Sequence, residues 1–130
     1  MKKAVNVESN FFDISLKEQM LSVKKVGFDG VFFDWSDSEE FTENVNFARE
    51  IGLEIASIHA PFDYVCDMWN KEKPEIFHKL IKCINDCGNL GVKTLVCHVY
   101  IGFDTLAKVT ETGIKNFSLL IDEAENKFSI

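Results

Sequence analysis

The stretch GFDGVFFDW at residues 27–35 recurs twice in altered form, as GLEIASIHA at residues 52–60 and as GVKTLVCHV at residues 91–99. Each copy begins with a glycine, continues into an apolar run, and places a polar residue seven positions after the glycine: Asp34, His59 and His98. Each copy also follows a segment with helical spacing of apolar residues. The glycine therefore stands where a helix must end, as a left-handed C-terminal cap.

The equal offset predicts where these three polar side chains lie. Successive side chains of a strand point to opposite faces, so Asp34, His59 and His98 are expected on one face of a parallel sheet, at its carboxyl edge. That edge is where α/β folds place their binding and catalytic residues.

The rest of the chain completes four βα units. We expect strands at residues 4–8, 30–35, 54–58 and 93–97, and Ser15 as the cap of the first helix. A second helix with acidic early residues ends at Gly52, Pro74 opens a third, and a fourth covers residues 114–124. Strands that alternate with helices at this spacing favour parallel pairing with right-handed crossovers.

Two architectures compete for this order of elements. A doubly wound sheet would need helices on both faces, whereas a barrel wall has helices on one face and an interior on the other. The expected helix-facing residues are Val31, Phe33, Ala56, Ile58, Leu95 and Cys97, and the opposite face carries Gly30, Phe32, Ile55, Ser57, Thr94 and Val96. This mixture of small, polar and bulky side chains favours the barrel, with an open sheet as the alternative.

Size and composition narrow the class of protein. The 130 residues form one predicted domain, and 46% apolar residues exclude an intrinsically disordered chain. The net charge of −7 works against binding to nucleic acids or anionic membranes. No apolar run reaches the roughly 20 residues of a membrane span, and the first ten residues lack a secretory apolar region, so we expect a cytoplasmic protein. The four cysteines show no CxxC spacing, which predicts free, mostly buried thiols.

His59 and His98 are the leading candidates for chemistry, because an imidazole can ligate a metal, hold a substrate hydroxyl or move protons near neutral pH. The alternative is that each is a hydrogen-bonded structural histidine at a strand end. Asp34 at the same offset favours a shared site, and Glu8 joins it if the first strand keeps that register. Other predicted substrate contacts are Trp35, which follows Asp34, and Phe62 and Trp69 in the aromatic loop after His59, read as an apolar wall or lid. Self-packing of that loop is the alternative.

Two segments, IASIHAPF around His59 and LGVKTLVCHVYIG around His98, supported by VGFDGVFFDW on the second strand, resemble the xylose isomerase-like (β/α)8 barrel superfamily. That superfamily holds sugar-phosphate isomerases and epimerases together with endonuclease IV-type enzymes. The resemblance implies a barrel that uses a divalent metal (manganese, magnesium or zinc) on a small carbohydrate or sugar phosphate. In its sugar branch, His59 and His98 would contact substrate; in its endonuclease branch they would bind zinc.

The chain departs from that superfamily in length, because a complete barrel takes about 250 residues and eight strands. It corresponds to the N-terminal (βα)4 half, so the metal carboxylates and the acid/base pair that the sugar branch draws from strands five to eight are absent. The sequence therefore leaves open whether the chain alone is an enzyme, and a non-enzymatic half-barrel assembly module or fragment is the alternative. Since a half barrel exposes two strand edges, we expect a homodimer that completes the barrel.

Overall fold

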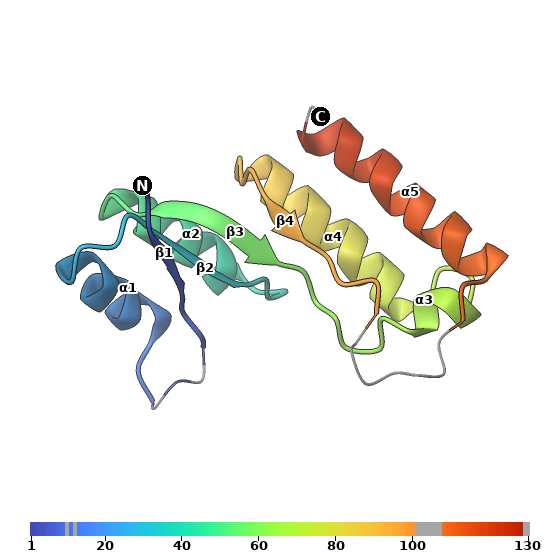
Figure 1. The fold of residues 1–130 in the computed structure, drawn as a ribbon, viewed down its shortest axis with the longest axis horizontal. Helices are drawn as coiled ribbons and strands as arrows, with labels where there is room; N and C mark the ends of the chain where they lie inside the picture. Colours follow the sequence, from blue (N-terminus) through green and yellow to red (C-terminus); the bar gives the residue numbers. More distant parts are fainter. Residues whose placement is uncertain (10, 12, 101–107, 129–130) are drawn as a thin grey trace.

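Four parallel strands form one sheet in the order β1-β2-β3-β4 (Figure 1). The computed structural model describes residues 1–9, 11, 13–100 and 108–128. The strands are β1 (Ala4–Asn6), β2 (Gly30–Asp34), β3 (Glu54–His59) and β4 (Leu95–Val96). The predicted α/β class and the parallel pairing of consecutive strands are confirmed.

Helices separate the strands and extend the chain beyond the last one. They are α1 (Leu16–Lys25), α2 (Glu39–Glu50), the short α3 (Asp67–Asn70), α4 (Glu75–Asn89) and α5 (Glu111–Phe128). α4 and α5 lie side by side at the β4 end of the sheet, and α5 also packs on α3 (Figure 1). Within the described segments, no helix has the length and apolar character needed to cross a bilayer.

Local signals set the helix ends. Gly27, Gly52 and Gly91 each follow a helix with φ of +93°, +75° and +64°, which confirms the predicted left-handed caps. Ser15 caps α1 as predicted, and its hydroxyl and backbone N–H form a reciprocal capping box with Glu18.

One face of the sheet carries the core. Val31, Phe33 and Ile58 are buried on the face covered by helices. Phe32, between two of them, is only half-buried and lies outside the core cluster, as alternation along a strand requires. The opposite face of β2 is therefore not covered by a helix among the described residues, in contrast to a doubly wound sheet.

A β-bulge in β3 changes the predicted alternation. Val31 lies opposite Ile55, but Phe32 lies opposite Ser57, so Ala56 is an extra residue in β3. As a result Ile55 packs against the core and Ala56 is exposed, which reverses the predicted faces of these two residues. Ile58, beyond the bulge, faces the helices as predicted.

The outer strands are shorter than predicted, because only three residues of β1 and two of β4 pair with a neighbour. The aromatic loop after β3 contains α3, which the sequence analysis did not anticipate. The predicted buried thiols are confirmed for Cys83 and Cys87, which lie one turn apart inside α4. A hydrogen bond between these thiols and burial raise the pKa of Cys83 far above its usual value.

Asn116 fixes the position of α5. Its side chain is 1% exposed, and its amide nitrogen donates to the carbonyl oxygens of Met68 and Lys71 at 2.8 Å each. The Lys73 backbone N–H donates to its side-chain oxygen at 3.1 Å. These three bonds join α5 to α3 and to the segment that links α3 with α4.

Candidate functional site

Asp34 and His59 lie level with each other at the carboxyl ends of β2 and β3. They are directly opposite in the pairing of the two strands, and the His59 Nδ1 atom is 3.7 Å from the Asp34 Oδ1 atom. This distance is too long for a direct hydrogen bond but short enough for ion pairing when the imidazole is protonated. The Asp34 side chain is exposed and the His59 side chain about one-third exposed, so a ligand can reach both.

His98 lies at the same edge, one step further along. His59 is opposite Val96 in the pairing of β3 with β4, so His98 follows two residues later on the same face of the sheet. The His59 and His98 rings are 6.1 Å apart between centroids and nearly perpendicular, at 82°. The structure therefore brings Asp34, His59 and His98 to one edge.

Two phenylalanines give this site apolar walls. The Phe62 ring is 5.6 Å from the His98 ring, and the Phe32 ring is 5.8 Å from the His59 ring. Phe62, a predicted substrate contact, is substantially exposed beside the histidines. Phe32 was not predicted as a site residue, although its position two residues before Asp34 places it on the same face.

Glu8 reaches the site from the end of β1. It lines a small polar pocket of about 90 Å³ together with Asp34, and the Asn6 side chain donates to its carboxylate at 2.8 Å. Asn44 of α2 also lines this pocket, and its buried side-chain oxygen has no hydrogen-bond partner in the part of the chain that the structure describes. This space has room for water molecules or for one hydroxyl-bearing group of a ligand.

Trp35 lies on the helix-covered side of the sheet, although it borders the small polar pocket. Its indole N–H donates to the Asp86 carboxylate of α4 at 3.0 Å, and the Lys82 ammonium lies 5.5 Å from its ring centroid. Hydrogen bonds to Asp86 and Asp37 raise the pKa of Lys82 above its usual value. Alternation explains the placement: if Asp34 faces the open side, its neighbour faces the helices.

Trp69 is buried, packs against α5 and contacts the segment that follows His98. Its indole N–H donates to the Val99 carbonyl oxygen at 2.9 Å, and its ring lies 5.0 Å from Phe117 of α5 and stacks on Tyr100 at 5.1 Å. A Cβ atom at Gly113 would lie 2.0 Å from this ring, so glycine is required there. This is the self-packing alternative for the aromatic loop, and here it positions α3 against α5.

The candidate donors among the described residues, Asp34, His59 and His98, do not make up a complete set of ligands for a divalent metal. Zinc sites use three or four protein ligands, and manganese or magnesium needs several oxygens. Within the described residues, no three histidine, cysteine or acidic side chains come together as metal ligands.

No protein-family model, curated protein or solved structure matches this chain. The likeness to the xylose isomerase-like superfamily rests on the quoted segments around His59 and His98 and stays a prediction.

Proposed function

We propose that Asp34, His59 and His98 form part of a binding site for a small carbohydrate or sugar phosphate, in a chain related to sugar-phosphate isomerases and epimerases. The observation that carries the proposal is the placement of Asp34 level with His59, with His98 beside them on the same face. Three polar side chains from successive strands then meet one ligand.

The chemistry of these groups suits a polyol that carries a phosphate. The Asp34 and Glu8 carboxylates accept hydrogen bonds from hydroxyl groups, and protonated imidazoles of His59 and His98 attract an anionic phosphate. The Phe62 ring supplies an apolar surface for the C–H faces of a sugar. These residues bind and orient the ligand.

Turnover needs more than these residues supply. Proton transfer between neighbouring carbon atoms requires a base within hydrogen-bond reach of the substrate and stabilisation of the charge that develops. We therefore assign ligand binding to this chain and propose that an isomerase or epimerase reaction needs the other half of a barrel. Any divalent metal would take ligands from that half, and no step here is assigned to it.

We propose that a second copy of the chain supplies that half. A sheet covered on one face has the layering of a barrel wall, and two four-stranded walls related by a two-fold axis would close an eight-stranded barrel. Assembly without catalysis is the second candidate function, and the apolar space beside β4 favours it.

NMR titration tests the sugar site. The imidazole resonances of His59 and His98 are expected to move when pentose or hexose phosphates are added, whereas those of His78 on α4, an exposed histidine away from the site, stay in place. Inorganic phosphate alone is expected to produce smaller shifts at higher concentration. Equal shifts at all three histidines, or none at His59 and His98, would refute the proposal.

His59→Gln and His98→Gln are the matching variants. Each keeps a hydrogen-bonding side chain but cannot take up a proton beside a phosphate as an imidazole can, so binding is expected to weaken about tenfold. The same change at His78 serves as the control and is expected to leave binding unchanged.

A further inference from the structure

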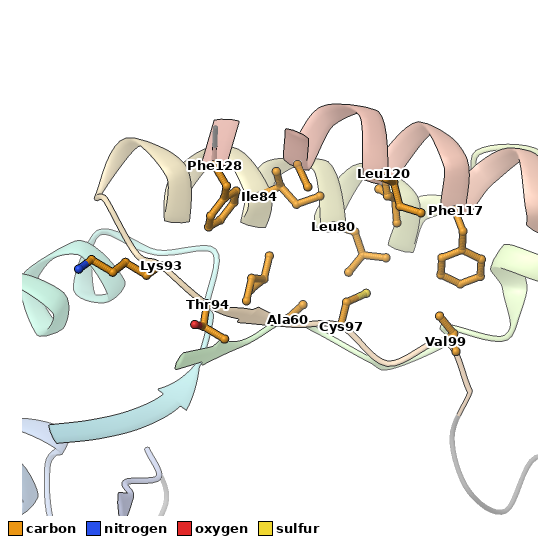
Figure 2. A pocket seen from close by; sticks show the side chains of 13 residues that line it. Ala60, Leu80, Ile84, Lys93, Thr94, Cys97, Val99, Phe117, Leu120 and Phe128 are labelled. Atoms are coloured by element: carbon orange, nitrogen blue, oxygen red, sulfur yellow. The ribbon is translucent and has the colours of Figure 1, made fainter. Parts of the chain in front are cut away.

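A space lined almost entirely by apolar side chains lies between β4 and α5 (Figure 2). This β4–α5 slot has a volume of about 400 Å³ and is lined by Leu80, Leu95, Cys97, Phe117, Ile121 and Phe128, among others. Cys97 is exposed, in contrast to the predicted buried thiol, but its sulfur points into the slot, where partial desolvation raises the pKa of the thiol. A slot of this size has room for side chains from another segment.

The slot borders an unpaired strand edge. The N–H groups of Ile58 and Ala60 donate to the carbonyl oxygens of Thr94 and Val96 at 3.0 and 2.9 Å, so these two residues of the β4 segment face β3. Leu95, between them, therefore directs its N–H and carbonyl groups away from β3. Because β4 ends the sheet in the described structure, this edge can accept one more strand.

α5 lies where it would cover such a strand. It runs opposite to β4, with Phe128 near Lys93 at the start of β4 and Phe117 near Val99 beyond its end (Figure 2). α5 is held by α3 and α4, and Ile121 remains 57% exposed beside the slot. An added strand would lie beside β4 and bury its helix-facing side chains against α5.

We propose that the β4–α5 slot receives β1 of a second copy of this chain, parallel to β4. The proposal rests on the barrel closure proposed above and names the contact that makes it. β1 is the other end strand of the sheet, and its central residue Val5 is half-buried and pairs with the buried Val31, so it faces the helix layer. A two-fold axis along the strands joins β4 to the partner's β1 twice, which closes both edges.

One pair of charges fits the same alignment, at an end of the slot that also carries the basic residues Lys93 and Lys127. A parallel strand enters the slot where β4 begins, which is where α5 ends. Glu125 lies one turn after Ile121 on this helix, and the terminal carbonyl groups add partial negative charge. The basic residue Lys3 immediately precedes β1, and neither its ammonium nor the Glu125 carboxylate forms an ion pair in the described part of the chain. In the dimer they would approach each other.

Sedimentation equilibrium of matched variants tests the slot. Ile121→Glu and Ile114→Glu change isoleucines on the same helix that are 57% and 55% exposed, but only Ile121 lines the slot. We expect a dimer for the natural chain and for Ile114→Glu, and a dimer dissociation constant raised by at least about tenfold for Ile121→Glu. Circular dichroism checks that both variants fold.

Charge reversal identifies β1 as the occupant. Lys3→Glu is expected to raise the dimer dissociation constant by about fivefold, and the double variant Lys3→Glu with Glu125→Lys is expected to recover most of this loss. A monomeric natural chain, a dimer unaffected by Ile121→Glu, or additive effects of the two charge changes would each overturn the proposal. The measurement contains no sugar, so its outcome is separate from that of the histidine titration.

Discussion

Replacing Asn116 by alanine tests how α5 is held in place. The substitution removes two donated hydrogen bonds, to Met68 and Lys71, and one accepted from the Lys73 backbone. The three backbone groups then lose their partner. Because Asn116 is only 1% exposed, water replaces its amide poorly.

The size of the effect follows from these bonds. Each contributes about 1 kcal/mol, giving a loss of about 3 kcal/mol. Alanine is a better helix former than asparagine by about 0.5 kcal/mol, which leaves a net loss of about 2.5 kcal/mol in the free energy of unfolding. With a urea dependence of about 2 kcal/mol per molar, the midpoint of unfolding falls by about 1.2 M.

Urea unfolding at one fixed protein concentration measures this shift. Ser118→Ala is the matched control, because Ser118 lies on the exposed side of the same helix and gains similar helix propensity. Its midpoint is expected to stay constant or rise slightly. A loss below about 1 kcal/mol for Asn116→Ala would refute the assignment of these bonds as the anchor of α5.

Three further predictions concern single positions. Gly30→Ala places a Cβ atom 2.7 Å from a backbone carbonyl oxygen of β3, so we expect a loss of about 2 kcal/mol in thermal unfolding, and an unchanged melting temperature contradicts this close approach. Hydrogen bonds from Ser15 lower the pKa of the Glu18 carboxyl below its usual value of 4.5, so these bonds stabilise the fold above that pH and are lost as the pH falls. Ser15→Ala should flatten this part of the acid-unfolding curve, and an unaltered curve would contradict the capping contribution. Cys83 and Cys87 should react with a thiol reagent only after denaturant is added, and rapid labelling of the native protein would show that α4 opens.

The glycine-to-polar offset predicted much of the candidate site. It placed Asp34 and His59 at one level and His98 on the same face, because the helix cap and strand alternation are local properties of the chain. Alternation would also have identified Phe32 as a site residue and Trp35 as a helix-facing residue.

Other features depend on contacts between distant segments. Trp69 and Gly113 are far apart in the sequence, and the residues around each do not indicate that the Trp69 indole fills the space where a side chain at position 113 would lie. Asn116 reads as an ordinary polar residue of a helix until its three backbone partners are known. The missed α3 has the same cause, because its residues pack on α5, which is distant in the sequence.

The extra residue in β3 has a consequence for how this sheet tolerates change. At the amino ends of the strands, Gly30 lies three residues after Gly27 and is opposite Glu54, which lies two residues after Gly52. At the carboxyl ends, Asp34 and His59 are opposite each other, and each lies seven residues after its leading glycine. The extra residue Ala56 makes up this difference of one residue before β3 reaches the carboxyl edge of the sheet. Because Ile55 and Ser57 already lie opposite the adjacent residues Val31 and Phe32, deleting Ala56 would straighten β3 and keep His59 opposite Asp34. This one position therefore tolerates a deletion, whereas losing a residue from the regular strand β2 would turn Asp34 to the other face of the sheet.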